Sequence, residues 1–164
     1  MIKVEIATIQ VSLVSPHRVL LLKEVEGERY LPIWIGACET EAISISLQGI
    51  EPPRPLTHDL LVELLELLDV RLEYIFVNEL ANDTFHAQLA LDVAGEERLL
   101  DCRPSDATAL AVRLKTPIYV HEKVMQQAGI VPEPGLLQES AADQDLDVFR
   151  DFLNQLDLDN LPTD

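Results

Sequence analysis

The sequence contains little of what secreted, zinc-binding or membrane-spanning proteins depend on. Its two cysteines, Cys38 and Cys102, are widely spaced and belong to no CxxC motif or Cys/His cluster. This argues against a disulfide framework and a structural zinc site, so a reducing cytoplasm is the expected compartment. No apolar run approaches the ~20 residues that a bilayer-crossing helix needs. Residues 1–5 lack a basic region followed by an apolar one, so we expect neither a signal peptide nor a membrane partner.

Basic residues are scarce as well. Lysine and arginine together number 12, against 29 aspartates and glutamates, and the formal net charge is −17. Such a chain repels a phosphate backbone unless its basic residues gather locally, so the charge argues against non-specific nucleic-acid binding. The sequence also contains no glycine-rich phosphate loop and no stripe of aromatic and basic residues of the RNA-binding type.

Hydrophobic periodicity predicts a single α+β domain. Apolar residues that alternate with polar ones predict strands at 2–14, 18–25, 30–35, 70–80, 84–93, 98–102 and 118–120. Apolar residues at helical spacing predict helices at 39–47, 57–68, 104–114 and 122–128. Thr57 and Ser105 are the expected N-caps of the second and third helices. A change in the phase of alternation near Ala7 and Thr8 predicts a β-bulge. We therefore expect a mixed, largely antiparallel sheet packed with helices.

A weak internal repeat accompanies this pattern. A shift of 65 residues places residues 41–45 over residues 106–110, and it brings the strand at 30–35 near the strand that ends at Leu100. Each half then consists of three strands followed by a helix that opens with an acidic residue and an alanine. This spacing predicts an internal pseudo-duplication within residues 1–130.

Beyond residue 130 the composition changes. Residues 131–138 are rich in proline and glycine and form the expected linker. Residues 139–164 form an acidic tail with eight acids and one base. Apolar residues recur at helical spacing in this tail and predict an amphipathic helix, packed on the body or on a partner subunit: Leu146, Phe149, Phe152, Leu153 and Leu156.

The first concentration of functional groups runs from Arg54-Pro55 to Asp59. It places a guanidinium, the imidazole of His58 and a carboxylate within six residues, where a proline-rich loop enters a helix. A helix start attracts anions, Arg54 has the geometry to clamp a phosphate or carboxylate, and histidine transfers protons near neutral pH. The structural alternative is that Thr57 and Asp59 cap the helix, Arg54 forms a surface ion pair and His58 is an exposed polar residue.

The second concentration, at residues 101–106, repeats the theme of a strand end, Arg-Pro, a hydroxyl and an acid. Asp101 and Asp106, together with Glu39 or Glu41, offer oxygen ligands for a divalent metal. The structural alternative is a strand-to-helix corner held by a buried pair between Arg103 and an aspartate. Ser105 is explained as a cap, and the segment contains no assignable nucleophile–base pair.

These segments also carry a resemblance to a known family. The ordered motifs resemble the bifunctional nuclease (BFN) domain over roughly residues 1–130. The matching runs are Leu31-Pro32-Ile33-Trp34-Ile35-Gly36 with Glu41-Ala42, Arg54-Pro55 with His58-Asp59-Leu60, Asp101-Cys102-Arg103-Pro104-Ser105-Asp106-Ala107 with Ala109-Leu110-Ala111, and Pro117-Ile118-Tyr119-Val120.

The resemblance implies hydrolysis of phosphodiester bonds in RNA and DNA, with Mg²⁺ or Mn²⁺ as cofactor, and a homo-oligomer, most simply a dimer. Carried onto the matching positions, His58, Asp59, Asp106 and Glu41 are the candidate catalytic residues. The candidate substrate-binding or anion-binding residues are Arg54, Arg103 and Ser105, and the candidate metal ligands are Asp101 and Asp106. Two alternatives stay open. One is a non-catalytic domain that binds a small anionic ligand or a protein partner, and the other is a structural oligomer whose Arg–Asp pairs hold the fold.

Overall fold

The computed structural model of the chain describes residues 1–11 and 18–131. The chain divides into two units, Met1–Ile130 and Val131–Asp164, and every helix and strand described belongs to the first. The predicted linker at 131–138, apart from Val131, and the predicted tail helix at 139–164 lie outside the described residues. None of the helices within the described ranges is long and apolar enough to span a membrane.

The predicted α+β class is confirmed. Within the described residues the chain forms seven strands and four helices. In chain order they are β1 (Ile2–Val11), β2 (Arg18–Glu24), β3 (Tyr30–Ile35), α1 (Ala37–Leu47), α2 (Thr57–Leu67), β4 (Val70–Ala81), β5 (Thr84–Val93), β6 (Glu96–Cys102), α3 (Pro104–Leu114), β7 (Ile118–Val120) and α4 (Glu122–Ala128). The seven strands form one mixed sheet, in which the pair of β4 and β7 is parallel and the other pairs are antiparallel.

The sheet is built from two similar halves. Its order is β3-β2-β1-β7-β4-β5-β6, so two three-stranded antiparallel meanders flank the short β7, and each meander leads into a helix, α1 or α3. The bulge predicted near Ala7 and Thr8 is confirmed, because the pairing of β1 with β2 shifts between Ile6 and Thr8. The pairing of β4 with β5 shifts at the corresponding place, between Leu72 and Tyr74. This shared connectivity supports the predicted duplication, but α1 and α3 begin at Ala37 and Pro104, so the helices are offset by 67 residues and the predicted offset of 65 was two residues short.

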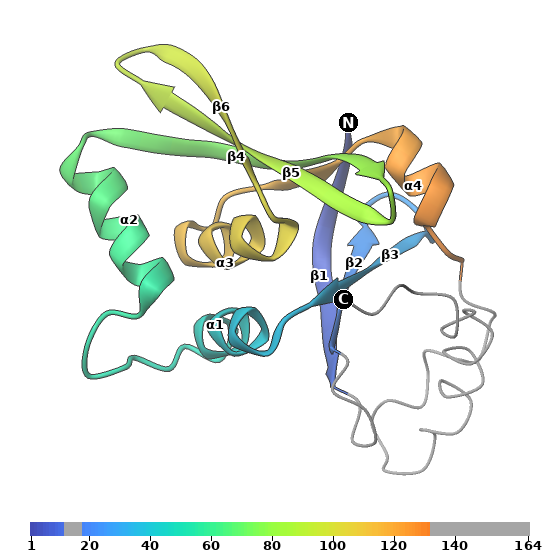
Figure 1. Ribbon diagram of the computed structural model, residues 1–164, viewed down its shortest axis with the longest axis horizontal. Helices are drawn as coiled ribbons and strands as arrows, with labels where there is room; N and C mark the ends of the chain where they lie inside the picture. Colours follow the sequence, from blue (N-terminus) through green and yellow to red (C-terminus); the bar gives the residue numbers. More distant parts are fainter. Residues whose placement is uncertain (12–17, 132–164) are drawn as a thin grey trace. The chain divides into compact units, whose positions relative to one another are not determined.

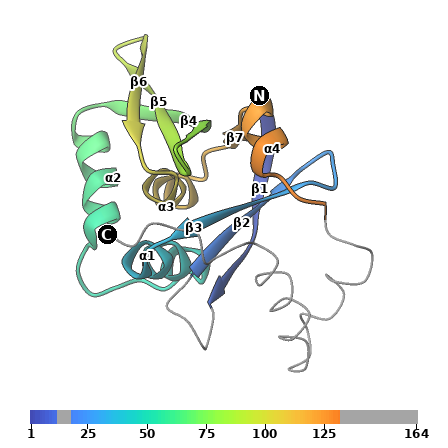
Figure 2. The ribbon, with the colours of Figure 1, turned by 45° about the vertical axis from the view of Figure 1, so that its right-hand side comes forward.

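One face of the sheet carries the hydrophobic core. Ile75, Val77 and Val120 are completely buried there, because alternate residues of each strand point to the same side. Helix α3 lies against β4 and β5, and α1 and α2 both contact α3 (Figure 1). The small side chains of Ala107 and Ala111 allow α3 to approach the sheet closely. Figure 2 shows α3 beneath the β4–β6 meander from a second direction.

The helix starts differ in detail from the prediction. Arg103 is the N-cap residue of α3 and Leu56 that of α2, so Ser105 and Thr57 lie inside the helices and are not caps. In α2 the carboxylate of Asp59 accepts a hydrogen bond from the Leu56 backbone N–H at 2.8 Å, so the third residue of the helix reaches back to its N-cap. In α3, Pro104 occupies the first helical position, where its missing N–H costs nothing.

The helix predicted at 57–68 from its periodic apolar residues forms, but most of its leucines face outward. Val62 and Leu65 pack on the core, whereas five leucines of this helix and its C-cap are exposed, and Leu67 retains 82% of its accessible surface. We call this surface the leucine face. Its members are Leu60, Leu61, Leu64, Leu67 and Leu68.

Candidate functional site

The two Arg-Pro segments meet at the starts of α2 and α3. His58 Nε2 lies 3.2 Å from Asp106 Oδ1, although the two residues are 48 positions apart in the sequence. His58 is buried, so its imidazole is a fixed part of the corner and not an exposed polar group. A carboxylate that holds one imidazole nitrogen orients the ring and leaves the other nitrogen, Nδ1, for chemistry.

Arg103 joins this pair to α1. Its Nε donates to Asp106 Oδ2 at 2.7 Å, and one terminal nitrogen donates to Glu39 Oε1 at 2.7 Å. The Arg103 side chain keeps 66% of its surface exposed, while the Glu39 side chain keeps 14%. Glu39, His58, Arg103 and Asp106 therefore form one connected group, which we call the helix-start cluster.

The cluster has an uneven charge balance. Burial raises the pKa of Asp106, but the hydrogen bonds from Arg103 and His58 outweigh this and hold it below its ordinary value. The hydrogen bond to Asp106, assisted by Glu39, raises the pKa of Arg103, so the guanidinium stays charged. One positive charge thus faces two carboxylates when His58 is neutral. An incoming phosphate would need a further cation.

A second ion pair lies behind the cluster and fastens three helices. Arg113 Nε donates to Asp59 Oδ1 at 2.5 Å, and its terminal nitrogen donates to the carbonyl oxygens of Ala42 in α1 at 3.0 Å and Ala109 in α3 at 2.9 Å. The Arg113 side chain is only 8% exposed. Burial raises the pKa of Asp59, but the hydrogen bonds from Arg113 and the Leu56 N–H outweigh this and hold the pKa below its ordinary value. Sequence reasoning missed Arg113, and its one signal is a lone base between Val112 and Leu114.

The other predicted site residues are spread around the corner. Arg54 and Glu41 are exposed, and neither forms an ion pair with the residues that the structure describes. Glu39, the alternative to Glu41, is the acid that reaches the cluster. Ser105 is buried in the first turn of α3, and Asp101 is exposed on β6.

The predicted metal ligands do not assemble into a donor set. Across residues 1–11 and 18–131 no group of three or more His, Cys, Asp or Glu side chains is arranged to hold a metal ion. Asp106 and Glu39 already pair with Arg103, which occupies the position between them that a cation would need. Burial, reinforced by Asp101 and Asp106, raises the pKa of Cys102 to about 12, so this thiol stays protonated. These residues do not fit a resident Mg²⁺ or Mn²⁺.

Comparison with known proteins gives consistent matches. A family model described as a bifunctional nuclease domain matches residues 20–133. An uncharacterized protein of Mycobacterium tuberculosis is 39% identical over 161 residues, which are 96% of each chain. Bifunctional nuclease 1 of Oryza sativa subsp. indica is 28% identical over 120 residues, covering 71% of this chain and 36% of the plant protein. Bifunctional nuclease 1 of Arabidopsis thaliana is 26% identical over 136 residues, covering 80% of this chain and 42% of that protein. The chain thus spans less than half the length of these plant relatives.

Replacing Arg113 with methionine is expected to destabilise the fold strongly. The substitution leaves the Asp59 carboxylate and the Ala42 carbonyl without their partner, and breaking a buried pair from one side costs about 3–5 kcal/mol. Urea unfolding measures the change. Arg98→Met is the matched control, because its pair with Glu96 is exposed on both sides and should contribute little. An equal effect of both substitutions would contradict the fastening role.

Acid is expected to weaken the same corner. The folded-state pKa values of Asp59 and Asp106 are lowered, so the unfolded chain binds protons more readily. Their contribution to stability is complete above the ordinary aspartate pKa and is lost as the pH falls through the lower folded-state values. The free energy of unfolding should therefore drop between about pH 5 and pH 3. Urea titrations should show a smaller drop in Asp59→Asn and Asp106→Asn, and an unchanged drop would refute this assignment.

Proposed function

The chain belongs to the bifunctional nuclease domain family, and on this premise we propose that it hydrolyses phosphodiester bonds of RNA and DNA at the helix-start cluster. The observation that carries the proposal is the pair between His58 Nε2 and Asp106 Oδ1, which is built from the two motifs that the family resemblance singled out. The names of the matching plant relatives, each called a bifunctional nuclease, support the choice of reaction.

In the proposed reaction His58 is the general base. Its Nδ1 takes a proton from an attacking water while Asp106 holds Nε2 and stabilises the imidazolium that forms. The hydroxide oxygen bonds to phosphorus, and the bond to the leaving oxygen breaks. That oxygen then receives the proton from His58, which restores the neutral ring. This sequence needs no nucleophile from the chain, in keeping with the absence of an assignable serine or cysteine nucleophile in the two motif segments.

Two arginines have complementary proposed roles. Arg103 is held in place by Glu39 and Asp106 and presents an exposed edge to the phosphate. Arg54 is exposed beside the start of α2 and supplies the further positive charge that the acidic cluster requires. Asp59 is committed to Arg113, so we assign it a positioning role. Because Arg103 pairs with the carboxylates of Glu39 and Asp106, the proposed reaction contains no step that uses a divalent ion.

A purely structural function for the corner is the second candidate. The observation that favours it is the bridge from Arg103 to Glu39 of α1 and Asp106 of α3, which would hold the two helix starts together in a protein that does no chemistry. The two candidates differ in whether His58 can be replaced without loss of nucleic-acid cleavage.

Purified protein is expected to cleave single-stranded RNA and DNA, and His58→Ala and Asp106→Asn should each lower the rate at least about a hundredfold. Arg54→Ala should mainly raise KM, because it removes a binding charge and no proton-transfer group. Glu28 is exposed, and Glu28→Gln removes one negative charge as Asp106→Asn does, so it serves as the matched control and should cleave as the wild type does. Circular dichroism checks that each variant is folded.

The same assay is run with Mg²⁺, with Mn²⁺ and with EDTA. Cleavage is expected under all three conditions, because Arg103 neutralises the carboxylates that would bind a metal. Loss of cleavage in EDTA would show that Arg103 gives way to a cation. Cleavage that survives both His58→Ala and Asp106→Asn would leave the structural candidate in place.

We also propose that the protein forms a homodimer through the leucine face. Five exposed leucines, four on one short helix and one at its C-cap, give more exposed apolar surface than the single apolar residues that monomers usually expose. A two-fold axis across α2 would bring two copies of this surface together. Glu63 and Glu66 on the same helix are exposed and would face their own copies, so salt should strengthen the association.

Light scattering after size exclusion tests this interface. The wild type is expected to elute as a dimer, more completely at high salt, and Leu64→Glu combined with Leu67→Glu should give a monomer. Leu99→Glu replaces an exposed leucine on β6 and should leave the dimer intact. A wild-type monomer at all salt concentrations, or a dimer in the double variant, would exclude the leucine face.

A further inference from the structure

A continuous row of side chains crosses the sheet on the face opposite the hydrophobic core. Lys3 of β1 is paired with Tyr119 of β7, Tyr119 with Phe76 of β4, Phe76 with Gln88 of β5, and Gln88 with Asp101 of β6. Residues paired directly across strands point to the same side of a sheet. Their neighbours along the strands, among them Ile75 and Ile118, are buried on the core side. The row therefore lies on the outer face.

Aromatic rings gather at the centre of this row. Tyr74 and Tyr119 meet edge to face with ring centroids 5.8 Å apart, and Phe76 and His121 lie 5.9 Å apart. Tyr74, Phe76, Tyr119 and His121 are all only partly buried, so their rings remain accessible. Four partly exposed rings on one face of the sheet form a platform on which flat ligands can stack.

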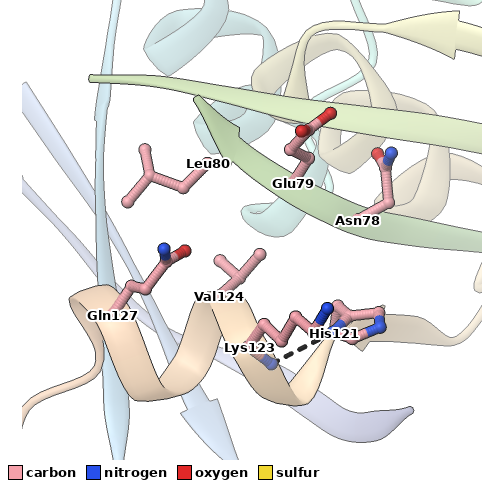
Figure 3. Close-up of a pocket in the computed structure, with 7 residues that line it drawn as sticks. All are labelled: Asn78, Glu79, Leu80, His121, Lys123, Val124 and Gln127. Atoms are coloured by element: carbon pink, nitrogen blue, oxygen red, sulfur yellow. Dashed lines mark hydrogen bonds between the residues drawn. The ribbon is translucent and has the colours of Figure 1, made fainter. Parts of the chain in front are cut away.

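A groove of about 290 Å³ adjoins the platform between β4 and α4. In Figure 3, Asn78 and Glu79 of β4 line one side of it, and Lys123 and Gln127 of α4 line the other. His121 Nδ1 accepts a hydrogen bond from the Lys123 backbone N–H at 3.0 Å, which fixes the ring and leaves Nε2 as a donor. The groove thus combines amide and carboxylate groups, which can bind the edge of a base, with donors and a cation, which suit a phosphate oxygen.

From this arrangement we propose that the outer face binds single-stranded nucleic acid, whose bases stack on Phe76 and Tyr119 and whose backbone passes Lys3 and Lys123. Lys3 and Lys123 are exposed and form no ion pair with any residue in the described ranges. Base stacking does not depend on net charge, so it offers an acidic protein a way to hold nucleic acid that a basic patch would otherwise provide. A duplex hides its base faces and is excluded from this mode of binding.

The row also leads to the helix-start cluster, and in this respect the inference rests on the proposed function. Asp101 ends the row, and Arg103 follows two residues later in the chain. Neighbouring strands are about 4.8 Å apart, so Tyr119 and Asp101, three strand spacings from each other, are separated by roughly 15 Å. A strand stacked on Phe76 and Tyr119 would therefore deliver a phosphodiester a few nucleotides away to the corner where Arg103 and His58 lie.

Fluorescence anisotropy tests the platform with labelled oligothymidylate and oligouridylate of about eight nucleotides. The full-length His58→Ala protein is used so that the probes are not cleaved. Adding Phe76→Leu or Tyr119→Leu is expected to weaken binding by roughly fivefold to a hundredfold, the range found when a stacking ring is removed. Tyr119→Phe keeps the ring and should bind as the parent does. Lys123→Gln should reduce the salt dependence of log affinity by about 0.7.

Phe85→Leu is the matched control, because Phe85 lies on β5 but packs against the core on the other face of the sheet. It should bind as the parent does, and thermal unfolding verifies that every variant is folded. Equal affinity of the parent, Phe76→Leu and Tyr119→Leu would overturn the platform, as would tight binding of a duplex or no binding by the parent. Binding without cleavage by the wild type would remove the proposed hydrolysis and keep the platform. Phe76→Leu and Tyr119→Leu are also made in the wild-type protein, and cleavage that neither of them changes would remove the platform and keep the hydrolysis.

Discussion

The buried guanidinium of Arg113 holds the three central helices in one arrangement. It binds the Asp59 carboxylate at the start of α2 and two backbone carbonyls, one in α1 and one in its own helix. Asp59 is the neighbour of His58, so the same contact sets the position of the imidazole that meets Asp106. Arg103 then links Asp106 to Glu39. A charge buried to this extent tolerates little displacement, because moving it away from its partners leaves it desolvated and unpaired.

The duplicated architecture explains why acids from two different helices meet at one arginine. Glu39 is the third residue after the N-cap Gly36 of α1, and Asp106 is the third after the N-cap Arg103 of α3. Equivalent positions at two neighbouring helix starts thus direct carboxylates toward the same point. One of the two half-repeats carries an arginine at its N-cap and the other a glycine, so the cluster is asymmetric although the halves share their connectivity. An acid in the first turn also interacts favourably with the helix dipole.

The two faces of the sheet carry different kinds of chemical groups. The core face holds the helices, whose starts assemble the compact cluster of charges, whereas the outer face exposes flat rings and a shallow groove. Buried core residues alternate with more exposed residues in parts of β4, β5 and β7, so one strand contributes to both faces. In the proposed function, the protein binds its substrate on the outer face and cleaves it at the helix-start cluster. In this proposal the negative charge of the chain weakens its contact with the phosphate backbone, so more of the binding comes from the bases.

Much of the fold could be predicted from local pattern, because periodicity is a property of neighbouring residues. The strands, the helices, the bulge near Ala7 and the family motifs were recognisable in this way, and Arg54 to Asp59 and Arg103 to Asp106 were correctly located at helix starts. The predicted caps were wrong, since Leu56 and Arg103 are the N-cap residues and Thr57 and Ser105 lie inside the helices. The leucines of α2 were helical as predicted, but a periodic stripe does not reveal whether anything covers it.

The sequence by itself determined which elements form and which residue types stand at their ends, because those depend on a few consecutive side chains. Only the tertiary structure decided which ends meet. Strand pairing and helix packing brought His58 to Asp106, selected Glu39 over Glu41 and buried Arg113 among three helices. The same pairing placed Phe76 beside Tyr119 across two parallel strands and so assembled an aromatic row that no contiguous stretch of the sequence contains. Contacts between residues more than 40 positions apart depend on the packing of the whole chain, and no local pattern encodes them.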